Sequence, residues 1–318
     1  MDNKMEFGLK IRSAVTFDAM KELTLYAEKN NYFGVFINDH VHGFKSKGNE
    51  PYLESWTVLS ALASVTSKIR LGQAVLFNSL RNPAFLAKSI AGLDVISCGR
   101  YELLLGAGWN IPEYEGYDLM EQGRGMPSAK ERVDRLKETL QILRLMLNNE
   151  ITNFEGKFWK LKDAINNPQP IQKNMRISVG GSKDRMIKIS AKYADGINVG
   201  DGLTRVQNII EKLQPSLEKN NKTLDKYFVS GSGTVTIATD EQEYKLLSED
   251  MAKRTGKSVE EIKQEYLIGT PEVLREKITN LEKIGMKLYI MSIQPAKTFD
   301  ETISKYDFFN KEVKQHFH

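Results

Sequence analysis

An acid and two histidines follow one short apolar run, in the segment Asn38-Asp-His-Val-His42. Histidine titrates near neutral pH, so His40 could take up or release a proton during catalysis, with Asp39 beside it to orient the ring. A His-x-His pair can also bind zinc, but no third ligand is clustered nearby, so no metal site is expected. The alternative is that His40 is an N-cap or loop histidine without chemistry. The segment is therefore a candidate acid–base site.

Paired glycines stand at two further points where apolar runs end. Gly106-Ala-Gly-Trp109 follows Tyr101-Glu-Leu-Leu-Leu105, and Val179-Gly-Gly-Ser182 precedes a predicted helix. Glycine weakens a strand, so we expect backbone or a ligand to approach closely at these points, the alternative being a bulge or a plain turn. A Gly-Gly turn that opens a helix can bind a phosphate through backbone N–H groups. The pattern favours a flat, anionic cofactor.

Strand-like runs alternate with helical segments along the chain, which indicates βα units and a parallel sheet. The runs number eight, as a closed (β/α)8 TIM barrel requires, and the C-terminal ends of its strands would bring the candidate residues to one face. The predicted strands are Phe7–Ile11, Gly34–Asn38, Ile69–Phe77, Tyr101–Gly106, Arg176–Gly180, Gly196–Val199, Phe228–Ile237 and Lys287–Ile293. The predicted helices are Phe17–Asn30, Leu53–Ser64, Pro83–Ile96, Ala129–Leu147, Asp184–Tyr193, Leu203–Lys219 and Pro271–Ile284.

The domain organisation follows from two interruptions of this rhythm. Residues 148–175 are too long for a βα connection and predict an insertion that carries a hairpin. Residues 240–265 predict a charged helical insertion. Neither has the composition of a linker, so we expect a single domain over residues 1–318.

Composition excludes several classes of partner. The chain has 45 Lys and Arg against 41 Asp and Glu, and the basic residues are scattered, so nucleic acid is not an expected partner. Cys98 is the single cysteine, which excludes an intramolecular disulfide and suggests a reducing compartment. No signal peptide and no apolar run of membrane-spanning length is visible. We expect a soluble cytoplasmic protein without membrane association.

These motifs together, in order along nearly the whole chain, resemble the bacterial luciferase-like flavin oxidoreductase superfamily. Within it, the chain is most similar to the branch that uses the deazaflavin coenzyme F-420. The segments that carry the resemblance are Asp39-His-Val-His42, Lys68-Ile-Arg-Leu-Gly72, Arg81-Asn-Pro-Ala84, Leu93-Asp-Val-Ile-Ser-Cys-Gly-Arg100, Gly106-Ala-Gly-Trp109, Asn153-Phe-Glu-Gly156, Gly180-Gly181 and Ala194-Asp-Gly196.

The resemblance implies a (β/α)8 barrel whose flavin ring lies over a bulge in the third strand, at a non-proline cis peptide bond. The matching bond is Ala74–Val75. Asp39 and His40 match a pair near the ring, where the histidine serves in deazaflavin alcohol dehydrogenases as the base for the substrate hydroxyl. Further cofactor contacts are implied at Ala107, Gly108, Val179, Gly180 and Gly181. Family members are usually homodimers that pack through helices near the second and third strands.

The chain departs from the family pattern at three positions. Trp109 stands where sugar-phosphate dehydrogenases of the family have a glutamate, and Phe44 stands where they have a tryptophan. Asp201-Gly202 lies near the place of a phosphate-binding lysine and offers no cation. An anionic sugar phosphate is therefore not the expected substrate. Trp109 and Phe44 predict an aromatic wall of the substrate pocket, or alternatively ordinary packing beneath a loop.

The resulting hypothesis is an oxidoreductase that transfers a hydride between a small organic substrate and coenzyme F-420. His40 is the predicted general acid or base, and Asp39 orients it and contacts the cofactor. Two alternatives stay open: a monooxygenase that uses reduced FMN, and a flavin-binding barrel without catalysis. The first alternative shares the barrel and the bulge, so the sequence separates the two cofactors poorly.

Overall fold

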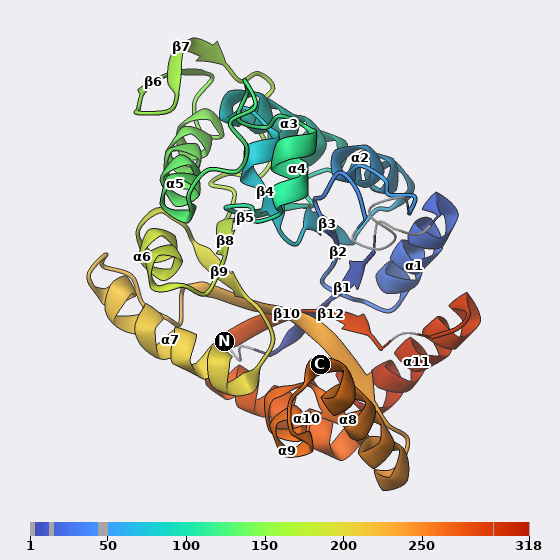
Figure 1. The fold of residues 1–318 in the computed structure, drawn as a ribbon. Helices are drawn as coiled ribbons and strands as arrows, with labels where there is room; N and C mark the ends of the chain where they lie inside the picture. Colours follow the sequence, from blue (N-terminus) through green and yellow to red (C-terminus); the bar gives the residue numbers. More distant parts are fainter. Residues whose placement is uncertain (1–3, 13–15, 44–49, 295, 318) are drawn as a thin grey trace.

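A closed ring of eight parallel strands forms the centre of the molecule (Figure 1). The computed structural model describes residues 4–12, 16–43, 50–294 and 296–317. Around the ring the strands run β12, β1, β2, β3, β5, β8, β9 and β10, and β10 pairs back onto β12. The strands are β1 (Glu6–Ile11), β2 (Gly34–Ile37), β3 (Arg70–Gln73), β5 (Tyr101–Gly106), β8 (Ile177–Gly180), β9 (Gly196–Val199), β10 (Phe228–Ile237) and β12 (Met286–Ile293). The predicted (β/α)8 barrel is confirmed.

The third predicted strand is interrupted. It divides into β3 and the short β4 (Leu76–Phe77), which pairs with β5 after residues 74 and 75 leave the sheet. The remaining short strand, β11 (Ile268–Gly269), extends the sheet beside β10. The other seven predicted strands lie within one residue of their observed bounds.

Helices surround the ring, as Figure 1 shows. They are α1 (Phe17–Lys29), α2 (Ser55–Val65), α3 (Pro83–Ile96), α4 (Ile111–Gly116), α5 (Ala129–Met146), α6 (Asp184–Tyr193), α7 (Leu203–Glu218), α10 (Pro271–Lys283) and α11 (Phe299–Glu312). The start of α3 shows why the local sequence forms a helix: Asn82 accepts hydrogen bonds from two first-turn amides, and Pro83 occupies the first position. Sequence reasoning missed α4 and α11.

The two interruptions carry secondary structure of their own. Antiparallel strands β6 (Ile151–Glu155) and β7 (Lys160–Ile165) form a hairpin after α5, and α8 (Glu241–Thr255) and α9 (Val259–Glu265) follow β10. The buried carboxylate of Glu138 on α5 accepts hydrogen bonds from the amides of Lys157, Phe158 and Trp159. The turn of the hairpin is thereby fixed to α5, since a buried carboxylate needs such donors.

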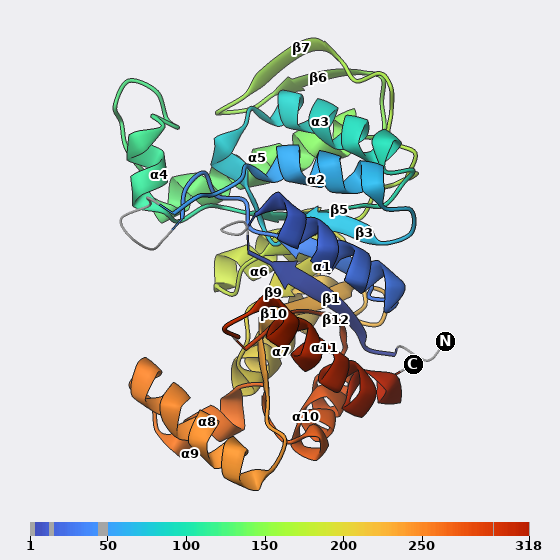
Figure 2. The same ribbon diagram turned by 90° about the vertical axis from the view of Figure 1, so that its right-hand side faces the viewer.

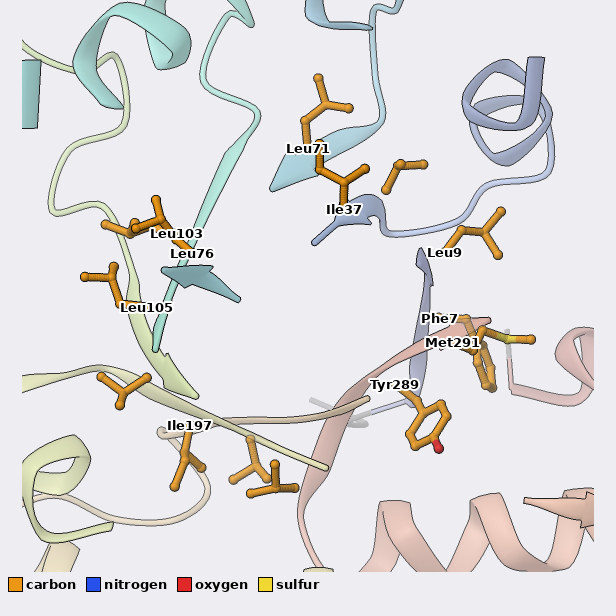
Figure 3. Close-up of a cluster of buried hydrophobic side chains, with 14 of the residues drawn as sticks. Phe7, Leu9, Ile37, Leu71, Leu76, Leu103, Leu105, Ile197, Tyr289 and Met291 are labelled. Carbon is orange, nitrogen blue, oxygen red and sulfur yellow. The ribbon is translucent and has the colours of Figure 1, made fainter. Parts of the chain in front are cut away.

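The main core lies between the ring and the helices. In Figure 3, side chains such as Phe7, Leu9 and Met291 point outward from β1 and β12, and all three are buried. Alternate residues of the same strands face the interior of the ring, where Leu288 and Ile290 pack in a second, smaller cluster. This alternation decides which side chains reach the mouth of the barrel. In the described part of the chain, no helix is long and apolar enough to cross a membrane.

Candidate active site

A cavity of about 320 Å³ opens at the C-terminal ends of β1, β2, β3 and β5. Figure 2 shows α4 projecting beyond the ring of strands at this end. The cavity brings together most of the residues predicted from the sequence. It is lined by Lys10, Asn38, Asp39, His40, Ala74, Val75, Leu76, Phe77, Gly106, Gly108 and Trp109. A cavity of this size at the mouth of a (β/α)8 barrel is where ligands bind.

His40 is paired with a carboxylate that the sequence analysis did not identify. Its Nδ1 lies 2.9 Å from Oε2 and 3.1 Å from Oε1 of Glu113, which α4 carries. The same carboxylate accepts a hydrogen bond from the amide of Val41 at 2.8 Å. Burial would raise the pKa of Glu113, but the hydrogen bonds from His40 and Val41 outweigh it and hold this pKa below its ordinary value. Glu113 is therefore ionised at neutral pH.

This contact fixes the tautomer of His40. A carboxylate is an acceptor, so Nδ1 carries the proton, and in the neutral ring the lone pair is on Nε2. The rings of Phe77 and Trp109 flank the imidazole, with centroids 6.3 and 5.8 Å away. Trp109 is 62% exposed and meets His40 edge to face, so it forms a wall of the cavity. An imidazole held in this way by a carboxylate can accept a proton at Nε2.

Asp39 does not contact the imidazole of His40, so the expectation that Asp39 orients this ring is wrong. Its carboxylate is 1% exposed and accepts hydrogen bonds from Ser55 Oγ at 2.6 Å and from the Phe77 amide at 2.8 Å. Both terminal nitrogens of Arg81 also bind it, at 2.6 and 3.0 Å. These partners come from α2 and from the segment that follows the bulge. Asp39 therefore anchors the wall of the cavity. Glu113, and not Asp39, contacts the imidazole of His40 and orients it.

The bulge of the third strand contains the expected non-proline cis peptide bond, between Ala74 and Val75. Val75 also explains two of the glycines. A Cβ atom on Gly106 would lie 2.5 Å from the Val75 side chain, and one on Gly180 would lie 2.7 Å from it. These glycines give space to the bulge itself, where the sequence suggested a cleared surface for a ligand. At Gly108, a Cβ would lie 1.9 Å from the Phe77 ring.

The loop after β5 is held by side chains from α4 and α5. Tyr114 donates to the carbonyl of Ala107 at 3.3 Å, and Arg132 donates to the carbonyl of Gly108 at 3.1 Å. The backbone that was predicted to touch a cofactor is thereby given a fixed position. Phe44, the second predicted wall residue, lies outside the described residues.

The predicted phosphate turn adjoins a larger cavity. The side chain of Val179 packs in the main core and the Gly181 amide donates to Asn198, so neither of these groups faces a ligand. The next residues, Ser182 and Lys183, line a cavity of about 670 Å³. Among the residues that the structure describes, no side chain caps the first turn of α6, which begins at Asp184. A helix N-terminus with free amides suits a phosphate group.

Two functional candidates were missed by sequence reasoning. Glu113 lies in α4, a helix of six residues that is too short for a periodic signal. Its proline at the second helical position was the available sign that a helix begins there. Lys10 belongs to a confirmed strand, and alternation along that strand could have placed it in the barrel interior.

A closed (β/α)8 barrel, with a histidine and an interrupted third strand at its mouth, defines the luciferase-like class of barrel enzymes. The chain belongs to the luciferase-like monooxygenase family, whose model matches residues 5–288. Among curated relatives, the pyrimidine monooxygenase RutA of Caulobacter segnis is 26% identical over 276 residues, which is 85% of this chain and 75% of that protein. RutA of Variovorax paradoxus is 31% identical over 211 residues, or 65% of this chain, and the match spans only 56% of that relative.

Solved structures agree on the fold. An F420-dependent secondary alcohol dehydrogenase, in complex with an F420-acetone adduct, has a TM-score of 0.81 at 18% identity, over 98% of both chains. The oxygenating constituent of 3,6-diketocamphane monooxygenase from Pseudomonas putida, in complex with FMN, has a TM-score of 0.72 at 20% identity, again over 98% of both. At this identity the likeness shows the fold alone, and both cofactors occur among the neighbours.

Proposed function

We propose that this protein is an oxidoreductase that transfers a hydride between a small organic substrate and coenzyme F-420, with His40 as general acid or base. The observation that carries the proposal is the 2.9 Å contact between His40 and Glu113 beside the Ala74–Val75 bulge. The residues present fit a flavin-type ring with a phosphate. The bulge and the loop after β5 border one cavity, and an uncapped helix N-terminus borders the other.

The bound cofactor would supply the hydride chemistry, while the protein positions the substrate and moves a proton. Nε2 of His40 would accept the hydroxyl proton of an alcohol substrate, or return it to a carbonyl in the reverse direction. Glu113 would keep Nδ1 protonated and offset the charge of the imidazolium that forms. Trp109 would shield the reacting atoms from water on the exposed side of the cavity.

Replacing Glu113 with glutamine is expected to lower kcat by about 10- to 100-fold. Glutamine has the size to reach Nδ1 but carries no charge to stabilise the imidazolium. A double-mutant cycle identifies the role, because residues that act as one unit are not additive. The E113Q/H40A double variant is expected to be no slower than the His40→Ala single variant.

The matched control is Glu115→Gln, an exposed carboxylate on the same helix, which should leave kcat unchanged. Additive losses in the double variant would contradict the proposed role of Glu113, since they would mean that it does not act through His40.

The choice of F-420 is supported by the cavity of about 670 Å³ beyond the phosphate turn. Coenzyme F-420 extends past its phosphate with an anionic tail that FMN lacks. Four cations border this cavity, against the carboxylates of Asp201, Glu261 and Glu265. The cations are Lys183, Arg205, Lys212 and Lys257. Because Lys212 already pairs with Asp184 and Lys257 with Glu261, Lys183 and Arg205 would provide the counter-charge for a longer anionic group.

A second candidate is a flavin-dependent monooxygenase, which the RutA relatives favour because their identity to this chain exceeds that of the F420-dependent structural neighbours. Titration of the purified protein with F-420 and with FMN, in oxidised and reduced forms, decides between the two. We expect tighter binding of F-420, followed by turnover in a screen of alcohols, aldehydes and unsaturated carbonyls. Binding of FMN alone, with turnover, would establish the second candidate, and cofactor binding without turnover would leave the flavin-binding barrel without catalysis.

We also propose a homodimer, formed through α2 and α3. These two helices contain only two charged residues, Lys88 and the buried Asp94, and they expose Val65, Phe85 and Ile96. An exposed apolar helix face of this kind is typical of a subunit interface. Phe85 is 67% exposed and stands out as the largest of these side chains.

Replacing Phe85 with glutamate is therefore expected to convert the dimer to a monomer, because the interface would have to bury a charge in both subunits. Light scattering after size-exclusion chromatography measures the mass directly. The control is Leu246→Glu, a 58% exposed leucine on α8, which should leave the mass unchanged. A monomeric unmodified protein would refute the dimer.

A further inference from the structure

A lysine stands inside the barrel at its mouth. Along β1, Phe7, Leu9 and Ile11 point outward into the main core. Gly8 faces the interior, because a Cβ on it would lie 2.8 Å from the ring of Phe36, an interior residue. Side chains alternate along a strand, so Lys10, two residues further, faces the interior as well.

Lys10 has an aromatic neighbour on one side in the ring, Phe36 of β2, and hydroxylic neighbours on the other. The next strand, β12, pairs in register with β1 up to Leu9 and Met291, so Ser292 lies beside Lys10. Ser292 in turn is 3.1 Å from the hydroxyl of Thr234 on β10. The lysine lines the same cavity as His40, and it also borders a second cavity of about 250 Å³ next to α1 and α11. It is thus a long cationic side chain beside open space.

Within the described ranges, no charged group contacts this ammonium directly. Lys10 forms no ion pair or hydrogen bond with the residues that the structure describes. Burial lowers its pKa, Asp201 offsets part of this effect from a distance, and Arg12 adds to the lowering. Burial likewise raises the pKa of Asp201, and Lys10 offsets part of this effect in turn. A half-buried, unpaired cation is stabilised when an anion binds next to it.

We propose that Lys10 is the counter-charge for the cofactor ring, and that it favours binding of the reduced form. This inference rests on the proposed function, since it requires a flavin-type ring in the cavity. An alcohol substrate gives up a hydride as its C–H bond breaks, and its hydroxyl proton passes to His40. The hydride carries two electrons and one proton, so its transfer to a neutral cofactor ring would add one negative charge, which the ammonium of Lys10 would offset.

The sequence offers no cation at Asp201-Gly202, near the place of the family's phosphate-binding lysine, and Lys10 on β1 is a cation at a different position of the mouth. The same ammonium could pair with an anionic group of the substrate. Both sources present negative charge beside the ring, and the experiment separates them.

The test compares Lys10→Met, which keeps the length of the side chain, with Lys10→Arg, which keeps the charge. Lys29→Met, exposed on α1 at the opposite end of the barrel, is the matched control. Dissociation constants of oxidised and reduced cofactor are measured for each protein, together with the midpoint potential of the bound cofactor. For Lys10→Met we expect the affinity for the reduced form to fall about tenfold relative to the oxidised form. A tenfold change in the ratio of the two dissociation constants corresponds to a two-electron midpoint potential that is lower by about 30 mV.

Lys10→Arg and Lys29→Met should keep the unmodified potential, and unchanged thermal unfolding excludes a folding defect. An unchanged midpoint potential in Lys10→Met would overturn this inference and leave the proposed function standing. So would a loss of substrate affinity without a change in potential, which would assign Lys10 to the substrate. If the unmodified protein bound neither F-420 nor FMN, the proposed function would fail and this inference with it.

Discussion

The His40→Ala variant is expected to lose about 10²–10⁴-fold in kcat, the usual contribution of a positioned general acid or base. Its affinity for the cofactor should stay within about twofold of the unmodified protein, because a base acts in the chemical step. The measurement is single-turnover hydride transfer, followed by the visible absorbance of the deazaflavin, alongside a binding titration.

The chain provides its own control for this experiment. His42 lies two residues away, and its Nδ1 faces the carbonyl of Gly43 rather than a carboxylate. It does not line the cavity, so His42→Ala should leave the rate unchanged. Unchanged turnover in His40→Ala would remove the base from the mechanism, and a parallel loss in both variants would indicate damage to the loop.

The second large effect concerns stability. Asp39→Asn should lower the free energy of unfolding by about 3–5 kcal/mol, the cost of breaking a buried ion pair on one side. The carboxylate binds Arg81 through both oxygens and also holds Ser55 and the amide of Phe77. Asparagine presents one acceptor instead of two and leaves the guanidinium partly unpaired. Urea unfolding followed by circular dichroism measures the loss.

Glu54 offers a matched comparison, because it also pairs with Arg81, at 2.7 Å. The side chain of Glu54 is 43% exposed. Glu54→Gln should cost only about 1 kcal/mol, because an exposed pair and a helix cap are each worth little. Equal losses of unfolding free energy in Asp39→Asn and Glu54→Gln would contradict this prediction. They would show that the burial of Asp39 does not make this residue the anchor of the segment.

The sequence predicted the barrel well because the signal for it is local and repeated. Each βα unit carries its own periodicity and turn residues, so errors in one unit do not spread to the next. The third strand was the exception. Its apolar run continues through Ala74 and Val75, and nothing in residue type distinguishes the two residues that leave the sheet.

The site was less predictable, because its contacts join distant segments. Asp39 stands next to His40 in the chain, which suggested that the two interact. Both residues follow the end of β2, where Asp39 bonds to Arg81 and Ser55 while His40 bonds to Glu113. The partner of His40 comes from 73 residues further on, in a short helix that only the folded chain brings near. Adjacency in sequence was therefore a poor guide to the pairing.

The packing of Val75 against Gly106 and Gly180 limits how the enzyme can be redesigned. A larger residue at either glycine would collide with the bulge, so both positions tolerate little variation. Trp109 belongs to the same cavity, but its side chain is mostly exposed, and its contact with His40 is edge to face. A mutant library aimed at new substrates should begin with Trp109, because changes there reshape the exposed entrance without disturbing the packing of Val75 against Gly106 and Gly180.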